Sequence, residues 1–371
     1  MGFLYVSPLI IYIPAGIYLF CFFKRFLTLF PFGNKKIPST ALSALFAVFC
    51  AALGWRVYGL GAVIVLHFVL ILVLCEGVNW ILKRAAASER FKRIWEIVFK
   101  SGLVSIVATA VVFCYGYINI QDVRETVYSV RSQKNLVEPL RIVQISDLHM
   151  GTTMDVEALN EYCGRIGERE PDLVVLTGDI FDESTERSMM MRAVPALAGI
   201  SARYGVYYVW GNHDPNRYRR DPNYSMDELR QTLLDNGIRV LEDEAVQVTP
   251  QLAVIGRYDV SNVSNRKGID ELLQGIDPAS YIVLLDHRPI GLEENASAGV
   301  DLQLSGHTHA GQIWPTGQLS ELLGINEKNY GMESFGNYHA IVSSGIAGWG
   351  YAIRTGGHSE YVIVDVQGRT S

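Results

Sequence analysis

Cysteine is scarce in this chain, with five residues in 371. Four of them fall in apolar runs near the start, and only Cys163 lies in the more polar remainder. Neither a disulfide framework nor a zinc–thiolate site can be built from that distribution. The glycines near position 348 also lack the Gly-x-Gly-x-x-Gly or Lys-Ser/Thr sequence of a phosphate-binding loop, so we interpret this segment as the wall of a pocket.

Positive charge is scarce in the last two thirds of the chain. Residues 1–120 hold eleven Lys or Arg against three Glu, a balance of +8, which leaves −14 for the remainder of a chain of net charge −6. That remainder shows no basic stripe with interleaved aromatic residues. Because it would repel a polyanion, we expect no nucleic-acid partner.

Apolar residues, by contrast, are abundant at 49%, and the mean hydropathy is +0.17. The excess lies in four runs near the start, at about 3–22, 41–58, 60–82 and 97–119. Each is close to the roughly 20 residues that a helix needs to cross a bilayer, so we expect four spans. Three spans remain an alternative, because only Arg56 and a short Gly-rich turn separate the second run from the third. A cleaved signal peptide is not expected, since no basic residue precedes the first run.

Basic residues cluster between the first two runs and between the last two. The positive-inside rule assigns both clusters to the cytoplasm, so both termini are expected outside. The sequence therefore predicts an integral protein of the plasma membrane whose C-terminal domain is extracytoplasmic. Glu76 and His67 are the acidic and imidazole side chains within the runs, and we interpret them as an interfacial and a packing residue.

The polar segment 121–138 is expected to be a linker between a membrane domain, 1–120, and a second domain, 139–371. In that second domain, strand patterns alternate with helix patterns, which predicts an α/β fold. The helix is expected at 156–169, and the strands at 141–146, 173–177, 206–210, 282–285 and 302–304. A polar motif follows each strand, so side chains distant in sequence can meet at one edge of a sheet.

These motifs supply seven candidate metal ligands: Asp147, His149, Asp179, Asn212, His287, His307 and His309. Carboxylate and amide oxygens together with neutral imidazoles suit divalent transition metals. Two such ions about 3.5–4 Å apart activate a water for attack on phosphorus. Each motif alone also fits a turn or a helix cap, and it is the combination that predicts a two-metal phosphoesterase site.

The ordered set of motifs, D-x-H, G-D-x-x-D, G-N-H-D, H and G-H-x-H, resembles the calcineurin-like metallophosphoesterase superfamily. The resemblance covers about residues 139–371, and the membrane segment resembles the superfamily's bacterial transmembrane branch, near proteins likened to UDP-2,3-diacylglucosamine pyrophosphohydrolases. It implies N-terminal transmembrane helices followed by a four-layer αββα sandwich.

The resemblance also implies a role for each motif residue. The first metal would be held by Asp147, His149 and His309, the second by Asn212, His287 and His307, and Asp179 would bridge the two. His213 would act on the leaving oxygen, with Asp182 orienting its ring. The two divalent ions would be Mn, Fe, Zn or Co.

These observations favour a membrane-anchored phosphoesterase that uses a metal-bridged hydroxide on lipid-linked or envelope phosphoesters, including phosphodiesters. An alternative within the enzyme class is a UDP-2,3-diacylglucosamine pyrophosphatase of lipid A biosynthesis, although its substrate would be cytoplasmic. A non-enzymatic alternative is a membrane receptor or assembly protein that binds a phosphorylated ligand. The sequence leaves the oligomeric state open.

Overall fold

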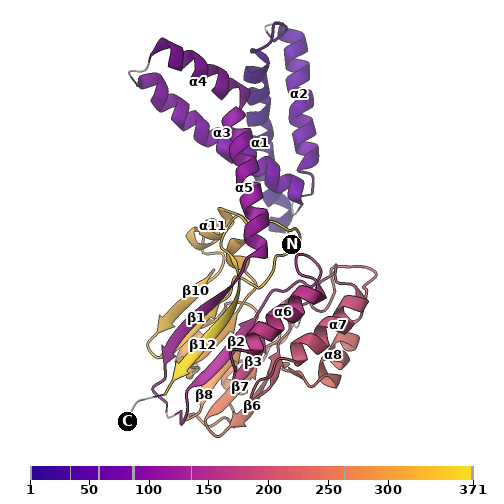
Figure 1. The fold of residues 1–371 in the computed structure, drawn as a ribbon, viewed down its shortest axis with the longest axis vertical. Coiled ribbons are helices and arrows are strands. Elements are labelled where there is room, and N and C mark those ends of the chain that lie inside the picture. The colour runs from indigo at the N-terminus through magenta and orange to yellow at the C-terminus, as the bar shows by residue number, and fades with distance from the viewer. Residues whose placement is uncertain are drawn as a thin grey trace. The chain divides into compact units, whose positions relative to one another are not determined.

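The computed structural model describes residues 2–33, 35–56, 59–85, 88–134, 136–262 and 264–368, with side chains from Tyr12 onward. The chain forms two compact units, one up to Tyr115 and one from Gly116 onward. Figure 1 shows the helices of the first unit and the sheets of the second.

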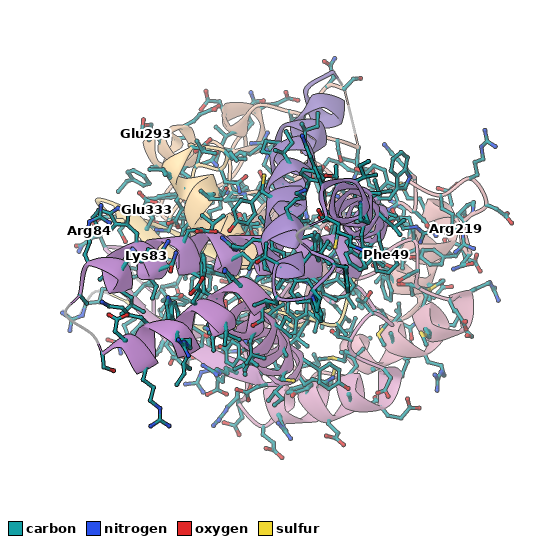
Figure 2. The ribbon with its side chains drawn as sticks, turned by 90° about the horizontal axis from the view of Figure 1, so that it is seen from above. Phe49, Lys83, Arg84, Arg219, Glu293 and Glu333 are labelled. Atoms are coloured by element: carbon teal, nitrogen blue, oxygen red, sulfur yellow. The ribbon has the colours of Figure 1, made fainter. Side chains whose placement is uncertain are left out.

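The first unit is helical. Its elements are α1 (Gly2–Leu27), α2 (Lys36–Leu53), α3 (Leu60–Arg84), α4 (Glu89–Ser101) and the first part of α5 (Leu103–Gln121). Among the described residues, α2, α3 and α5 are long and apolar enough to cross a membrane. Side chains on them are exposed, as Phe49 is on α2 (Figure 2), which suits a lipid environment. The first expected span falls on α1, whose early side chains lie outside the described residues.

The last expected span, 97–119, begins too early. Residues 97–101 belong to α4, an amphipathic helix that Ser88 caps by accepting a hydrogen bond from the Phe91 amide. Gly102 has a φ of 70°, a left-handed conformation that ends α4 and separates it from α5. The spanning helix therefore starts at Leu103. The boundary between α4 and α5 could not be predicted from the sequence, because the apolar residues of α4 are followed directly by the apolar residues of α5.

The second unit contains two six-stranded sheets. The first has the order β1-β12-β2-β3-β4-β5, with β1 (Val123–Arg131), β12 (Ser359–Gln367), β2 (Leu140–Ile145), β3 (Leu173–Leu176), β4 (Val206–Tyr208) and β5 (Arg239–Val240). The second has the order β10-β11-β9-β8-β7-β6, with β10 (Gly331–Phe335), β11 (Tyr338–Val342), β9 (Leu302–Ser305), β8 (Tyr281–Leu285), β7 (Leu252–Gly256) and β6 (Glu244–Thr249). From β2 to β5 and from β7 to β9 all neighbours are parallel.

Alternate residues of each strand face opposite layers, as the two-residue period of a strand requires. On β2, Val143 packs with α6 (Val156–Gly167), α7 (Arg187–Ala198) and α8 (Met226–Asp235), whereas Ile142 packs against the other sheet. On β8, Val283 faces the first sheet and Leu284 faces α9 (Ile269–Leu272) and α10 (Leu292–Ala298). The layers are thus helix, sheet, sheet, helix, which confirms the αββα sandwich.

The expected linker 121–138 differs from the structure, because half of it, Val123–Arg131, forms strand β1. This strand pairs in parallel with β12, from Val123 opposite Ser359 to Arg131 opposite Gln367. It lies at the edge of its sheet and its side chains alternate between exposed and partly buried positions, so its sequence looks like a polar loop. The expected strands further on were placed within two residues of β2, β3, β4, β8 and β9.

Candidate metal centre

The candidate ligands follow strands whose carboxyl ends lie at one edge of the two sheets. Asp147 follows β2, Asp179 follows β3, Asn212 follows β4, and His287 and His307 follow β8 and β9. Five of the seven have a positive φ: Asp147, His149, Asp179, His307 and His309. Non-glycine residues rarely adopt this conformation, and such strain concentrates at functional sites.

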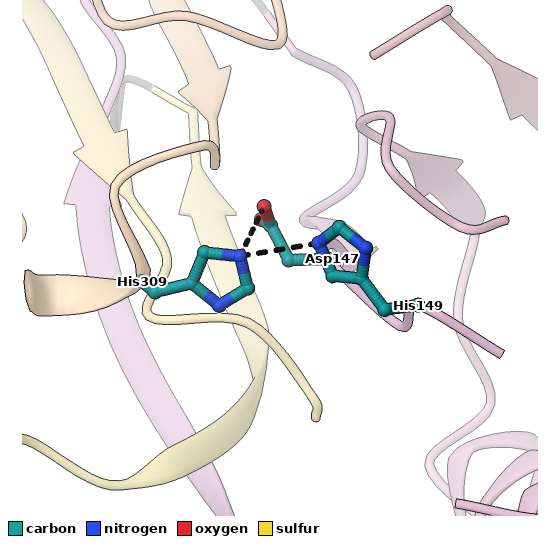
Figure 3. Close-up of side chains that lie close together, drawn as sticks. All are labelled: Asp147, His149 and His309. Atoms are coloured by element: carbon teal, nitrogen blue, oxygen red, sulfur yellow. Dashed lines mark hydrogen bonds and ion pairs between the residues drawn. The ribbon is translucent and has the colours of Figure 1, made fainter. Parts of the chain in front are cut away.

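Three of these side chains form a first group (Figure 3). The Nε2 atom of His309 lies 3.3 Å from Asp147 Oδ1 and 3.2 Å from His149 Nε2. All three residues are buried, and one ligand atom from each lies within 4.8 Å of the others. This spacing suits a single ion held by one oxygen and two nitrogens.

A second group consists of Asp179, His287 and His307, which meet the same distance criterion. His287 Nε2 lies 3.1 Å from Asp179 Oδ2 and 3.2 Å from His307 Nδ1. Asp179 Oδ2 is also 3.9 Å from His149 Nε2, so this carboxylate lies between the two groups. Asn212 is buried near the second group, where its Oδ1 accepts a hydrogen bond from Arg288 at 3.3 Å.

The outer nitrogens of two histidines are fixed by hydrogen bonds. His149 Nδ1 lies 3.1 Å from Asp182 Oδ2, and His287 Nδ1 lies 2.9 Å from the Thr177 carbonyl oxygen. Since only a protonated nitrogen can donate to these oxygens, either ring, in its neutral form, presents the lone pair of Nε2 to the site. Lone pairs directed at a shared point repel unless a cation lies between them, so the donor set fits a metal ion.

The charges around the groups also fit bound cations. Burial raises the pKa of Asp147. Burial favours neutral His287, but the Asp179 and Asp147 carboxylates outweigh it and raise the pKa of His287 to about 10. Burial lowers the pKa of His307 to about 3, and the nearby His287 and Arg288 act in the same direction. The buried carboxylates therefore favour positive charge at His287, whereas His307 stays neutral and able to coordinate.

His213 lies beside the groups and contacts neither of them through its ring nitrogens. Its backbone amide donates to Asp179 Oδ1 at 2.8 Å, and its Nδ1 lies 2.9 Å from Glu183 Oε2. The ring centroid is 5.1 Å from that of Tyr218 and 5.5 Å from that of Trp349. Burial alone would lower the pKa of His213, but its hydrogen bond to Glu183 and the nearby carboxylates raise it.

The expected partner of His213 was wrong. Asp182 contacts His149, a residue of the first group, whereas Glu183 contacts His213. The two acids are adjacent in sequence and their side chains diverge, so one position along the chain decides which imidazole each one holds. The motif G-D-x-x-D draws attention to Asp182, and nothing in it indicates Glu183.

Two further residues support the site without having been singled out. Asp214, the last residue of G-N-H-D, accepts hydrogen bonds from the amides of Asp179, Phe181 and Gly211. Buried Arg354 donates to the carbonyls of His309, Ser344 and Ala347. It thereby joins the G-H-x-H turn to residues 343–350, the glycine-rich loop. The motif contained a signal for Asp214, whereas Arg354 stands in no motif.

A cavity of about 380 Å³ opens beside His307 and His309. Its lining includes the carboxamides Gln312, Asn326 and Asn329 together with the rings of Trp349 and Tyr351. Gln312 donates to the carbonyls of Trp349 and Ile353 at 3.1 and 3.0 Å and thereby holds one wall in place. The space is therefore adjacent to both groups and can take a ligand with polar and apolar parts.

The chain is similar to several known proteins. A family model described as calcineurin-like phosphoesterase matches residues 140–311. A metallophosphoesterase of Aquifex aeolicus is 32% identical over 263 residues, which is 69% of this chain and 96% of the relative. A bovine transmembrane protein with a metallophosphoesterase domain is 29% identical over 238 residues, 60% of this chain and 51% of the relative. The solved structure of a dimetal phosphatase from Danio rerio matches over 56% of this chain and 88% of the phosphatase chain, with 15% identity and a TM-score of 0.38.

The chain belongs to the calcineurin-like metallophosphoesterase superfamily and is a phosphoric ester hydrolase. Its two groups of candidate ligands suit the divalent metals that this family uses, and its apolar helices agree with relatives named as transmembrane proteins.

Proposed function

We propose that the chain is a membrane-anchored phosphoesterase that works with two divalent metal ions. The observation that carries the proposal is the position of Asp179, whose Oδ2 lies 3.1 Å from His287 Nε2 in one group and 3.9 Å from His149 Nε2 in the other. A carboxylate has two oxygens and can bridge two ions. Asp147, His149 and His309 would hold the first ion, and Asn212, His287 and His307 the second.

Such ions, when bound, activate water and neutralise the charge of the phosphate oxygens. The ligand set of carboxylate, amide and imidazole suits Mn, Fe, Zn or Co. The protein's own contribution is to hold the ligands rigidly, through Asp214 beneath Asp179 and Asp182 behind His149. Outer contacts of this kind orient metal ligands and tune their basicity.

His213 is proposed to donate a proton to the leaving oxygen. Glu183 occupies its Nδ1 atom, so Nε2 is the nitrogen available to a substrate. Contacts with Tyr218 and Trp349 restrict rotation of the ring. An imidazole held in one orientation can protonate an alkoxide as the bond to phosphorus breaks.

Anchoring is proposed to place the catalytic domain outside the cytoplasm. The support is the distribution of basic residues: Lys83 and Arg84 end α3 (Figure 2), and Arg90, Lys92 and Arg93 follow on α4. Both groups belong to the connection between two candidate spans, which the positive-inside rule assigns to the cytoplasm. Phosphoesters of the envelope or of membrane lipids are the substrates that such a location offers.

The proposed function can be tested by metal removal from the purified full chain. Treatment with a chelator should abolish hydrolysis of bis(p-nitrophenyl) phosphate, and added Mn²⁺ or Zn²⁺ should restore it. Asp179→Asn should lose both ions, as measured by elemental analysis, while Asp270→Asn, an exposed change on α9, should keep two per chain. Hydrolysis by metal-free protein would contradict the proposal, and two bound ions without turnover would favour the non-enzymatic receptor.

A further inference from the structure

An exposed apolar surface lies next to the candidate metal centre. It consists of Trp314, Leu319, Leu322, Leu323 and Ile325, in and around α11 (Thr316–Leu322), and we call it the α11 surface. Leu322 is 80% exposed, Leu323 68% and Ile325 67%. Residues 313–325 contain a single charged side chain, Glu321. A patch of this kind on a folded domain marks a surface that is covered in use.

The α11 surface is connected to the end of helix α5. The Arg354 amide donates to the Gly116 carbonyl at 3.0 Å, and Asn119 Nδ2 donates to the Arg354 and Gly357 carbonyls at 3.1 and 2.8 Å. The Trp314 amide in turn donates to Thr355 Oγ1 at 2.9 Å. One short loop, 353–357, therefore contacts both the last turns of α5 and the start of the α11 surface.

This connection indicates what covers the surface. Helix α5 is a candidate membrane span that ends at Gln121, so its last turns mark where the chain leaves the bilayer. Tyr117 and Ile118 on these turns are 55% and 67% exposed. Tyr and Trp are enriched at the boundary between lipid and water. Tyr117 lies on the turns of α5 that the 353–357 loop contacts through Gly116 and Asn119, and Trp314 contacts Thr355 of the same loop. Lipid is thus the covering that is continuous with a segment already suited to it.

The same surface forms part of the cavity beside the metal centre. Ser320 and Ile325, on and after α11, line the cavity together with His307 and His309. Asn326 and Asn329 add polar groups between them. A ligand in this cavity can therefore place a phosphate toward the histidines while its other end reaches Ile325 of the α11 surface.

We propose that the α11 surface lies in the interfacial layer of the bilayer and that the site hydrolyses phosphoesters carrying a long alkyl or acyl chain. The docking half rests on the apolar surface and its connection to α5. The substrate half also rests on the proposed phosphoesterase function. Burial of apolar side chains at the interface stabilises this arrangement, and it brings a membrane-resident phosphoester to the cavity without extraction into water.

The substrate half is tested with p-nitrophenyl alkyl phosphodiesters, from methyl to dodecyl, added to the full chain in lipid nanodiscs. For the parent, kcat/KM should rise by at least about tenfold along the series, since each buried methylene favours binding. Leu322→Glu should reduce the rise to less than about threefold and leave hydrolysis of the methyl ester unchanged. An equal rise in this variant and the parent would overturn the proposal. No hydrolysis of the methyl ester by the parent would instead refute the proposed function.

Leu234→Glu is the matched control. Leu234 is 40% exposed on α8, near the point where the chain enters β5 and so at the opposite edge of the sheet from the ligands. It is also an exposed leucine on a helix, and its replacement should leave the whole chain-length series as in the parent. A loss of the rise in this control as well would show a general effect of added charge and would overturn the proposal.

The docking half is tested without any activity. A nitroxide attached at Leu323→Cys, in a full chain whose five native cysteines are alanine, should collide more with lipid-soluble oxygen than with a water-soluble nickel chelate. The same label at Leu234→Cys should show the reverse. A water-exposed label at position 323 would overturn the docking surface even if the enzyme were active. Spin coupling between labels of two chains would assign the surface to a second copy and would equally overturn it.

Discussion

At the scale of single residues, Gly211 and Gly306 leave no room for a side chain beside the candidate ligands. A Cβ atom at Gly211 would lie 2.1 Å from Asp179 Oδ1, and one at Gly306 would lie 2.2 Å from Asp147 Oδ2. Neither glycine has a positive φ, so the constraint is one of space. The backbone of one motif therefore packs directly on the carboxylate of another.

Gly211→Ala should weaken metal binding by about 10–100-fold, because the methyl group would displace Asp179, the proposed bridging carboxylate. Isothermal titration of the chelator-treated full chain with Mn²⁺ measures this. Gly164→Ala is the control: its Cβ meets nothing within 4 Å in the middle of α6, and it should leave affinity unchanged. Equal affinity of the Gly211 variant and the parent would show that Asp179 does not coordinate.

A second prediction concerns proton transfer. His213→Ala should lower kcat by about 10²–10⁴-fold on an alkyl ester, which has a poor leaving group, and much less on a p-nitrophenyl ester. Glu183→Ala should show the same dependence on leaving group with a smaller loss, and Glu183→Gln should recover part of it, since an amide oxygen still accepts from Nδ1. All three should keep two ions per chain. Equal losses on both esters would exclude a role in leaving-group protonation.

The ligand types could be predicted from the sequence because strand ends, glycines and histidines occur in local motifs. The partner of His213 could not, since Asp182 and Glu183 differ only in the direction of neighbouring side chains. Arg354 was beyond prediction for another reason. Its three acceptors, the carbonyls of His309, Ser344 and Ala347, are ordinary backbone atoms that meet only in the folded chain.

At the scale of elements, the junction of β12, β1 and the glycine-rich loop depends on one buried carboxylate. Glu360 Oε1 accepts from the Ser344 amide at 2.9 Å, and its Oε2 accepts from Tyr330 at 3.0 Å and from Thr126. Burial alone would raise the pKa of Glu360, but hydrogen bonds from His358, Thr126 and Ser344 lower it below the usual value. The ionised form is thus the one that the fold favours.

The depressed pKa of Glu360 predicts how stability changes with pH. Its contribution is fully present above the unfolded pKa, near 4.3, and is lost as pH falls through the lower folded pKa. Glu360→Gln should reduce stability by about 2–4 kcal/mol at pH 7, because donors lose a charged acceptor, and by less at pH 3. Thermal unfolding of the full chain in detergent measures this. The exposed change Glu161→Gln should have no effect. A difference in stability between Glu360→Gln and the parent that does not change with pH would contradict the proposed role of ionised Glu360.

The five strands that lead to the motif residues could be predicted to within two residues, whereas β1 and α4 could not. The core strands β3 and β8 are continuous apolar runs, which is the pattern of a strand covered on both faces. Strand β1 is part of the sheet because it pairs with β12, whose residues come more than two hundred positions later in the chain. Helix α4 is separated from α5 only by the backbone conformation of Gly102, which composition does not reveal.

At the scale of the whole molecule, the proposed sidedness gives a direct test. Alkaline phosphatase fused after Ser371 should be active, and green fluorescent protein at the same position should not fluoresce. The reason is that the positive-inside rule would keep the basic connections, including that between α3 and α5, in the cytoplasm. Fluorescence without phosphatase activity would contradict an extracytoplasmic domain and would favour the UDP-2,3-diacylglucosamine pyrophosphatase alternative.

The pairing of β1 with β12 has a consequence for how the protein is made. Strand β1 directly follows helix α5, yet its neighbour in the sheet, β12, is the last of the described strands along the chain. While the ribosome is still translating, β1 exposes an unpaired edge at the end of a membrane helix. A chain terminated before Ser359 would keep that edge open. The edge of β1 that pairs with β12 is therefore covered only after residues 359–367 have been synthesised.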